Sequence, residues 1–335
     1  MTQDVRREQL AVWVHSLAGW GNATLELATD DASFRRYFRA SQDGRTAIVM
    51  DSPPDKEPVA PFIDMTARLY EAGVHVPEIF AQNPLDGFLL LEDFGNTLLL
   101  NAIHPGNADH LYADAMQALL KVQQADVEHL PDYHEEMLYR ELNIMPEWFL
   151  GQHLGFAPHD IPQGLIEDTF GFIVEELLEQ PVAFTHRDFH SRNLMLTATD
   201  SPGVIDHQGA VLGPVTYDLV SLLRDCYIAW PQQRVDYWSC QFRKMAIAAG
   251  TIPPVDEPTF KRWFDLTGLQ RHIKVLGIFA RLNHRDGKSG YLKDLPLTLS
   301  YVMQIGSRYQ ETARLVEWMR QAGIPERVGT VVIPH

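Results

Sequence analysis

Cysteine, basic residues and long hydrophobic runs are scarce in this 335-residue chain. Its two cysteines, Cys226 and Cys240, have no His or Cys neighbours at metal-ligand spacing, so we interpret them as reduced thiols of the core. No hydrophobic run approaches the roughly 18 residues that a membrane-spanning helix needs. The polar start, residues 1–10, is unlike a secretory signal. These features predict a soluble, cytoplasmic protein with no membrane partner.

The excess of acidic residues excludes a further class of function. Lys and Arg number 28 against 44 Asp and Glu, which gives a formal net charge of −16. Phosphate backbones repel such a chain, so we expect no binding to nucleic acid. The hydrophobic fraction of 45% is that of an ordinary globular protein, and no obligate protein partner is evident. At about 100–200 residues per domain, the length predicts two domains or lobes.

The pattern of hydrophobic residues changes after Gly95. Before it, short runs favour strands and two segments favour helices; after it, long helical patterns dominate. We therefore predict an α+β protein with a small β-rich lobe (1–91), a hinge (92–95) and a larger helical lobe (96–335). Ligand pockets favour such junctions. The expected strands are 24–28, 36–40, 47–50 and 88–91 in the first lobe and 182–185, 194–196 and 204–205 in the second. The expected long helices are 108–124, 137–151, 166–178, 215–229 and 300–322.

The segment with the clearest chemistry is a polar loop between two expected strands, residues 185–195. It places His186, Asp188 and Asn193 at fixed spacing, and Asp206 follows at the end of the next strand. Phosphoryl transfer needs such groups. Asp188 can orient a hydroxyl and accept its proton, while Asn193 and Asp206 can hold Mg²⁺ against nucleotide phosphates. A polar hairpin loop without activity is the alternative interpretation.

This loop resembles the catalytic loop of the aminoglycoside phosphotransferase and choline kinase superfamily, which shares the protein-kinase fold. Further segments resemble the bacterial cell-wall amino-sugar kinases, which phosphorylate the anomeric hydroxyl of N-acetylmuramate and N-acetylglucosamine in peptidoglycan recycling. The resemblance implies a bilobal protein-kinase-like fold, ATP and Mg²⁺ as cofactors, and a small sugar as substrate. The segments that carry it, besides the loop, are 31–39, 48–54, 87–95, 213–219 and 281–292.

The resemblance also implies roles for individual residues. Asp188 would be the base, His186 and Arg187 would shape the loop, and Asp218 would anchor it. Backbone groups of the hinge would bind adenine. The residues that would contact the nucleotide are Glu92 and Phe94 in the hinge, and Ser33 and Arg36 at the phosphates.

The chain departs from the kinase pattern in two places. The third strand, 47–51, has no Lys, and the following helix offers no matching Glu, so neither charge is left buried alone. Arg36, Arg39 and Lys56 are the candidate cations for the phosphates. Gly209 stands where an acidic residue is expected from the resemblance.

Two further features bear on the acceptor. Glu147 stands beside Trp148, an aromatic residue suited to stacking on a sugar; a buried Trp with a solvated acid is the alternative. Residues 271–293 are rich in Lys and Arg, and Arg281 and Arg285 would share a helical face. This basic stretch would bind the lactyl carboxylate of N-acetylmuramate or a phosphate, or it is a set of solvated charges.

Two other functions remain open. A kinase of another small alcohol, such as an aminoglycoside or choline, would share the loop, although a cationic acceptor would favour an acidic pocket over the basic stretch 271–293. A nucleotide-binding scaffold without turnover is favoured by the missing strand Lys. The presence of Asp188, Asn193 and Asp206 together argues against that scaffold.

Overall fold

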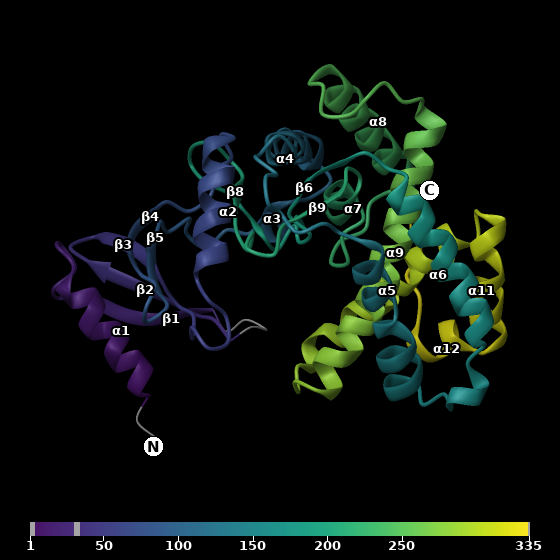
Figure 1. Cartoon of the computed structure of the whole chain (residues 1–335), viewed down its shortest axis with the longest axis horizontal. Helices are drawn as coiled ribbons and strands as arrows, with labels where there is room; N and C mark the ends of the chain where they lie inside the picture. The colour runs from purple at the N-terminus through teal and green to yellow at the C-terminus, as the bar shows by residue number, and fades with distance from the viewer. Residues whose placement is uncertain (1–3, 30–33, 334–335) are drawn as a thin grey trace. The chain divides into compact units, whose positions relative to one another are not determined.

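The computed structural model describes residues 4–29 and 34–333, and it divides into two compact units (Figure 1). The first unit comprises Met1–Thr97 with Met195–Gly209, and the second comprises Leu98–Leu194 with Ala210–His335. The division near Thr97 follows the expected hinge. Residues 195–209, which the sequence analysis placed in the helical lobe, group instead with the first unit.

The first unit is built on a five-stranded antiparallel sheet of order β1-β2-β3-β5-β4. Four of its strands were predicted. The fifth, β4, is a half-buried edge strand without a hydrophobic run, so its sequence carries little strand signal. The strands are β1 (Thr24–Thr29), β2 (Arg36–Gln42), β3 (Arg45–Asp51), β4 (Ile79–Asn83) and β5 (Phe88–Leu91).

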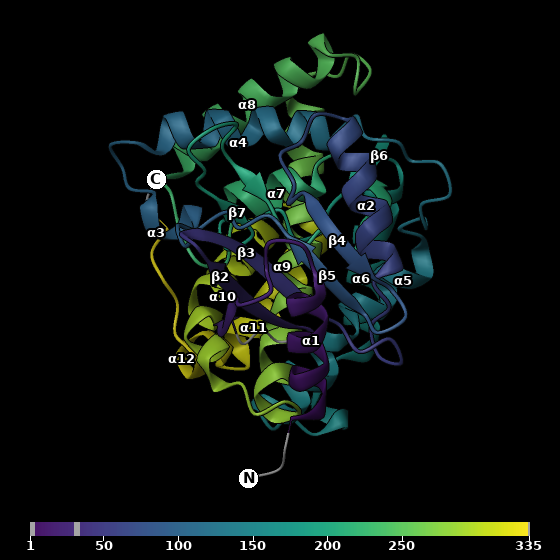
Figure 2. The ribbon, with the colours of Figure 1, turned by 90° about the vertical axis from the view of Figure 1, so that its left-hand side faces the viewer.

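Two helices cover opposite faces of this sheet, α1 (Val5–Ser16) and α2 (Ala60–Glu71) (Figures 1 and 2). Side chains alternate between the faces of a strand. Accordingly, Phe88 and Leu90 of β5 pack in one hydrophobic cluster with α1, and Leu89 and Leu91 pack in another with α2. The central strands are therefore buried on both sides, which explains their nearly continuous hydrophobic runs.

The second unit is mainly helical and surrounds a single long helix, α9. Its strands β6 (Val182–Thr185) and β9 (Val211–Pro214) pair with each other. A further short pair of the chain joins β7 (Leu194–Met195) and β8 (Gly203–Val204). The helices are α3 (Leu99–Ala102), α4 (Ala108–Gln123), α5 (Glu135–Leu142), the π-helix η1 (Met145–His153), the short 3₁₀ turn η2 (Pro158–Asp160), α6 (Gln163–Leu178), α7 (Tyr217–Leu223), α8 (Gln232–Ala248), α9 (Glu257–His284), the 3₁₀ turn η3 (Ser289–Asp294), α10 (Leu295–Gly306), α11 (Gln310–Gln321) and α12 (Ile324–Val328).

Two expected helices are wrong in their extent. The pattern over 137–151 is divided between α5 and η1, where Pro146 removes a backbone donor. The pattern over 300–322 is divided between α10 and α11. The turn between them is fixed from α9, because the Asp265 carboxylate accepts hydrogen bonds from Arg308 (3.1 Å) and from the Tyr309 hydroxyl (3.0 Å). A tertiary contact therefore overrides a local helical pattern.

Other expectations hold only in part. The helix expected over 215–229 is shorter, since α7 ends at Leu223. Cys226 therefore lies outside a helix; it is buried and free, whereas Cys240 is free and only partly buried. None of the helices in the described residues combines the length and hydrophobicity that crossing a bilayer requires.

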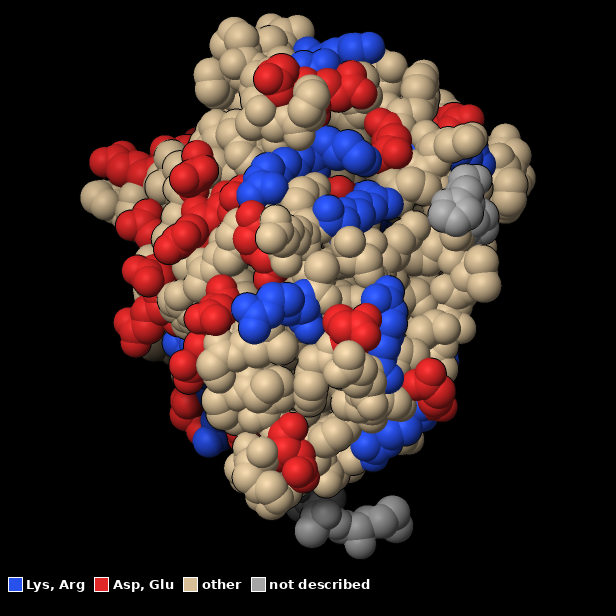
Figure 3. Space-filling model, turned by 90° about the vertical axis from the view of Figure 1, so that its right-hand side faces the viewer, with Lys and Arg blue, Asp and Glu red and all other residues tan. Residues whose placement is uncertain are grey.

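Acidic and basic side chains both occur on the face that Figure 3 shows. Acidic residues gather along one margin of that face, and basic residues are interspersed over its middle. Opposite charges also pair between helices of the second unit, as between Arg262 of α9 and Glu176 of α6 (Nε–Oε2 3.0 Å). Such partly exposed pairs contribute little to stability, about 1 kcal/mol or less each.

Close packing between α9 and η1 depends on one glycine. A Cβ at Gly277 would lie 2.6 Å from the backbone of Ile144 and Met145. We therefore expect Gly277→Ala to destabilise the protein by about 1–3 kcal/mol, the usual cost of overpacking. The measurement is chemical unfolding followed by fluorescence. Gly164→Ala in α6 is the matched control, since nothing lies within 4 Å of that Cβ; equal unfolding midpoints for the two variants would contradict the prediction.

Candidate active site

The loop that follows β6 is held at its start by a buried carboxylate. Asp218, in the first turn of α7, accepts hydrogen bonds from the backbone N–H groups of His186 (2.6 Å) and Arg187 (2.9 Å). Burial raises the pKa of Asp218 to about 7, although the two N–H donors favour its ionised form. Arg187 adopts a left-handed backbone conformation, with φ of +75°. Such strain in a non-glycine residue persists only where its surroundings fix it, and Asp218 supplies that constraint.

A second buried carboxylate holds the loop farther along. Asp225, just after α7, accepts a hydrogen bond from the backbone N–H of Ser191 (2.9 Å) and another from the Ser191 hydroxyl. The Ser191 carbonyl in turn accepts a hydrogen bond from the backbone N–H of Leu100 (3.0 Å). The loop therefore has fixed points on both sides of Asp188.

Asp188 lies between these fixed points and is exposed to solvent. Its dense surroundings raise the pKa of the carboxyl, but positive charges nearby, including Lys274 and Arg187, more than offset this and lower the pKa below its usual value. An exposed carboxylate that is ionised at neutral pH can accept a hydrogen bond or a proton from a bound hydroxyl. Asp188 can therefore take the predicted role of base, which stays a prediction.

His186 is fully buried and contacts the loop rather than the solvent. Its Nδ1 accepts a hydrogen bond from the backbone N–H of Asp188 (3.3 Å), so the ring's own proton lies on Nε2 in the neutral form. The imidazole also packs edge-on against Phe189. The side chain is therefore placed to set the backbone of Asp188.

The two predicted metal ligands differ in their setting. Asn193 lies in the second unit, where its Nδ2 donates to the Asp188 carbonyl (3.0 Å), so the oxygen is the atom that the amide offers to a metal. Asp206 lies in the first unit, and one of its carboxylate oxygens accepts a hydrogen bond from Gln208 (2.8 Å). An amide oxygen and a carboxylate are hard oxygen ligands of the kind that Mg²⁺ prefers, so the donor set fits that ion.

Helix α2 holds the segment that carries Asp206. The neighbouring His207 is fully buried, its Nε2 lies 2.7 Å from the Thr66 hydroxyl, and its ring packs on Phe62 (centroids 4.6 Å apart). The sequence analysis found no Glu at the position on this helix that would match a strand Lys. Its contact with the Asp206 segment is made by a hydroxyl and an aromatic ring instead.

The predicted hinge is fixed by its side chains. Phe94 packs on His75 (centroids 4.5 Å apart) and against Gly203, where a Cβ would lie 2.6 Å from the ring. Asp93 pairs with Arg39 through two hydrogen bonds of 2.7 and 2.9 Å. Glu92 donates its backbone N–H to the Glu78 carbonyl (2.9 Å). With Asp93 and Phe94 engaged in this way, backbone groups are what the segment can offer to a base.

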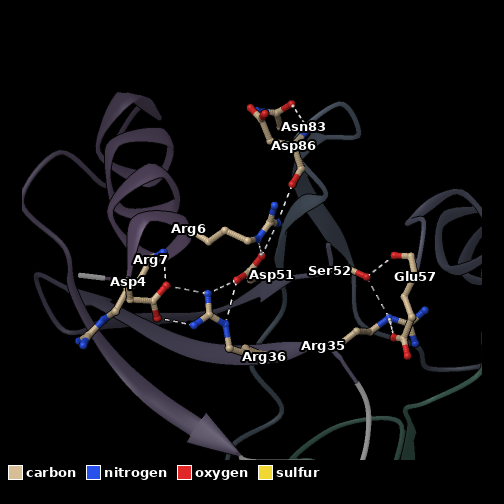
Figure 4. A network of polar contacts seen from close by, with 10 residues as sticks. All are labelled: Asp4, Arg6, Arg7, Arg35, Arg36, Asp51, Ser52, Glu57, Asn83 and Asp86. Carbon is tan, nitrogen blue, oxygen red and sulfur yellow. Dashed lines mark hydrogen bonds and ion pairs between the residues drawn. The ribbon is translucent and has the colours of Figure 1, made fainter. Parts of the chain in front are cut away.

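Arg36 belongs to an ion-pair network of the first unit (Figure 4). It contacts Asp4 and donates to the fully buried Asp51 carboxylate (Nε–Oδ2 3.0 Å), which also accepts from Arg6 of α1 (Nε–Oδ1 2.9 Å). The pKa of Arg36 is raised by these carboxylates, Asp4 first. Its predicted contact with phosphate stays a prediction.

Two of the remaining candidates for contact with the nucleotide lie close to carboxylates. Arg39 pairs with Asp93, as described, and Lys56 lies 3.8 Å from the adjacent Asp55 carboxylate. Ser33 lies outside the described residues. The choice among the three candidate cations therefore stays open, as it was from the sequence.

The three predicted acceptor residues lie on η1 and at the C-terminal end of α9. Glu147 is exposed on η1, which packs against α9, and its charge raises the pKa of Arg281, although burial and the neighbouring Arg285 leave that pKa lowered overall. The Arg281 Nε is buried and has no hydrogen-bond partner among the described residues. Arg285, by contrast, is exposed and bonded to Asp286 (2.9 and 3.0 Å). Trp148 is partly buried against the hydrophobic core.

Sequence reasoning did not assign several residues to the support of the loop. Asp225 was not considered, although it follows Asp218 by only seven residues. Lys274 was grouped with the basic stretch 271–293, although buried hydrophobic residues flank it on α9. Glu141 was considered with Glu147 for the wall of the pocket, but it is buried on α5. Arg192 gave no local signal; its guanidinium lies over the Tyr227 ring, 3.8 Å from its centroid.

Comparison with known proteins agrees with this geometry. A family model described as the APH phosphotransferase enzyme family matches residues 24–248, about two thirds of the chain. The chain belongs to this phosphotransferase family. The enzyme named N-acetylmuramate/N-acetylglucosamine kinase of Pseudomonas aeruginosa is 43% identical over 97% of this chain and 99% of its own length. Its namesake of Pseudomonas putida is 42% identical over 94% of this chain and 96% of its own length.

The fold is also that of solved members of the family. The crystal structure of the aminoglycoside phosphotransferase APH(2'')-Ib with bound ADP superposes with a TM-score of 0.60 at 11% identity, covering 90% of this chain and 99% of that one. At this identity the likeness establishes the fold alone. It confirms the predicted α+β, protein-kinase-like fold of this phosphotransferase.

The anchoring of the loop leads to a test on Asp218. Asp218→Ala leaves two buried N–H groups without their acceptor, so we expect a loss of about 2 kcal/mol or more in unfolding free energy and a fall in turnover. Unfolding curves and phosphotransfer assays measure both. Asp236→Ala on α8, which removes a half-exposed partner of Lys261, is the matched control and should cost about 1 kcal/mol or less. Similar losses in the two variants would refute the anchoring role.

Proposed function

We propose that this phosphotransferase transfers the γ-phosphoryl group of ATP to the anomeric hydroxyl of N-acetylmuramate and N-acetylglucosamine. The observation that carries the proposal is the exposed, ionised Asp188 on a loop fixed at both sides by buried carboxylates. The two named relatives, which match nearly the full length of the chain, support the choice of acceptor.

In the proposed reaction, Asp188 orients the anomeric hydroxyl and accepts its proton as the oxygen attacks the γ-phosphorus. The bond from that phosphorus to the bridging oxygen breaks, and ADP leaves. An anomeric hydroxyl is more acidic than an ordinary alcohol, so a single carboxylate is a sufficient base. Positioning supplies much of the rate in such transfers, and we assign His186 to that task, since its ring bonds to the Asp188 backbone.

We assign Asn193 and Asp206 as the oxygen ligands of Mg²⁺, which neutralises phosphate charge when bound. The backbone of the hinge around Glu92 and Phe94 would recognise adenine. Arg36 remains a proposed contact of the phosphates, and its present carboxylate partners would share it. Since the co-substrate is ATP, we propose that the enzyme works in the cytoplasm, where its sugar 1-phosphate product is ready for nucleotide activation in peptidoglycan recycling.

For the acceptor we propose contacts with Glu147, Arg281 and Arg285. N-Acetylmuramate differs from N-acetylglucosamine by a lactyl ether with one carboxylate. Arg281 is the better placed of the two arginines for that carboxylate, because its Nε has no hydrogen-bond partner in the described part of the chain. Arg285 is bonded to Asp286 and would act at longer range.

The experiment that tests the function is an ATP-consumption assay of the purified protein with Mg²⁺ over a panel of acceptors. The panel contains N-acetylmuramate, N-acetylglucosamine, an aminoglycoside and choline, with identification of the phosphorylated carbon. We expect turnover with the two amino sugars and a product phosphorylated at C1. Turnover with choline or the aminoglycoside alone, or nucleotide binding without turnover on any acceptor, would overturn the proposal.

The role of Asp188 as base gives a quantitative prediction. Asp188→Asn should lower kcat by about 10²–10⁴, the usual contribution of a positioned general base. The affinity for Mg·ATP should stay within a few-fold, because the amide keeps the size of the side chain. Steady-state kinetics and calorimetric titration measure the two quantities. Turnover close to that of the wild type would exclude Asp188 as the base.

Acceptor selectivity gives a second prediction. Arg281→Ala should raise KM for N-acetylmuramate by about tenfold or more, since a charge-assisted hydrogen bond contributes about 1.5–3 kcal/mol. KM for N-acetylglucosamine should change much less, because that sugar has no carboxylate. Arg285→Ala is the matched variant and should have the smaller effect. Equal losses for both sugars would mean that Arg281 has a general structural or phosphate-binding role instead.

A further inference from the structure

A buried cluster of charges lies behind the loop that carries Asp188. We call it the α9 cluster and define it as Glu141 of α5, Arg187 of the loop and Lys274 of α9. The Lys274 Nζ lies 3.0 Å from Glu141 Oε1, and the Arg187 guanidinium donates to the same oxygen. One carboxylate oxygen of α5 therefore joins a helix of the core to the residue that precedes Asp188.

Two tyrosines and a glutamine complete the surroundings of this cluster. The Tyr133 hydroxyl donates to the other oxygen of Glu141, which also lies 3.4 Å from the Gln270 amide nitrogen. Lys274 donates to the Tyr217 hydroxyl (3.1 Å). The Arg187 guanidinium lies over the Tyr133 ring, 5.6 Å from its centroid. Every charge in the cluster has a named partner, as buried charges require.

The burial of the cluster makes its members dependent on one another. Glu141 is 5% exposed and Lys274 is 9% exposed. Burial would raise the pKa of Glu141, but Lys274 and Arg187 reverse this and lower it. Burial would likewise lower the pKa of Lys274, but Tyr217 and Glu141 reverse it. Both groups are therefore charged at neutral pH, and removal of Glu141 would leave the charges of Lys274 and Arg187 without their shared carboxylate.

We propose that Glu141 and Lys274 are positioning residues for phosphotransfer, which hold Arg187 and thereby the loop on which Asp188 lies. This inference rests on the proposed role of Asp188 as base. Asp218 fixes the Arg187 backbone, but its bonds leave the guanidinium unconstrained; Glu141 fixes that end. With both its backbone and its guanidinium held, Arg187 has a defined orientation. Asp188 is the next residue in the chain, so the positive φ of Arg187 sets the direction in which the backbone enters Asp188.

The main test is Glu141→Gln, which keeps the shape of the side chain and removes its charge. We expect kcat to fall by about 10–100-fold, since a displacement of about 1 Å at a reacting group can cost 10²-fold. KM values for ATP and for the sugar should stay within about twofold, because Glu141 is buried and both of its carboxylate oxygens are bonded within the protein. Loss of substrate affinity without loss of kcat would overturn the proposal.

A double variant separates positioning from general damage. If Glu141 acts through Asp188, then Asp188→Asn/Glu141→Gln should turn over at the rate of Asp188→Asn, within about twofold, because the second change has nothing left to misplace. Multiplication of the two losses would refute the proposal. A failure of the proposed function has a different signature: Asp188→Asn alone would then retain its activity.

Lys274 provides a second, milder route in case Glu141→Gln does not fold. Lys274→Met leaves the Glu141–Arg187 pair intact, and we expect kcat to fall by about 3–10-fold at unchanged KM, with recovery in Lys274→Arg. The control is Lys261→Met on the same helix, whose partner Asp236 lies at the surface; it should leave kcat unchanged. A folded Lys274→Met with the kcat of the wild type, or a Lys274→Arg without recovery, would contradict the role of Lys274.

Discussion

The loop that carries Asp188 depends on two buried carboxylates, Asp218 and Asp225. The loop lies between short strands and contains a residue with positive φ, so a regular ladder of backbone hydrogen bonds cannot define it. Each carboxylate instead accepts backbone N–H groups of the loop, at 2.6–2.9 Å. Charge-assisted bonds of this kind are stronger than neutral ones. The arrangement requires that two carboxyl groups be buried, which disfavours their ionised form. Burial accordingly raises the pKa of Asp218 to about 7.

The loop could be predicted from the sequence, and the resemblance also implied one of its supports, Asp218, whereas its other supports could not be predicted. His186, Asp188 and Asn193 are close in sequence, so their spacing alone indicated their chemistry. Their supports come from α5, α7 and α9, which are brought to the loop only by folding. Helix α9 is buried on nearly every side from Phe264 to Leu276, so it lacks the amphipathic pattern by which helices are recognised. The sequence analysis grouped its Lys274 with the basic stretch 271–293, which was assigned either to binding an anion or to a set of solvated charges.

The first unit shows how the fold accommodates the absence of a strand Lys. In the expected kinase arrangement, a Lys of the third strand pairs with a Glu of the following helix. Here β3 ends with a buried carboxylate, Asp51, and two arginines neutralise it, Arg6 from α1 and Arg36 from β2. The strand therefore carries the negative charge instead of the positive one, and its partners lie on α1 and β2 instead of the following helix. The buried charge is nevertheless compensated. The sequence revealed the missing pair; the replacement needed knowledge of where α1 packs.

Helix α9 carries basic side chains in two different settings. Arg271, Lys274, Ile278, Arg281 and Arg285 recur at intervals of three and four, so they lie along one face of the helix and its C-terminal cap. Lys274, at the buried end, pairs with Glu141 and donates to the Tyr217 hydroxyl, so its charge is compensated within the protein. Arg281, half-buried farther along, has a buried Nε without a hydrogen-bond partner in the described residues. Within two turns of one helix, the two residues therefore differ in how far their hydrogen-bonding capacity is used inside the protein. We expect a substitution at Arg281 to leave the buried pair of Lys274 and Glu141 undisturbed, because the two sites share a helix but no contact that the structure shows.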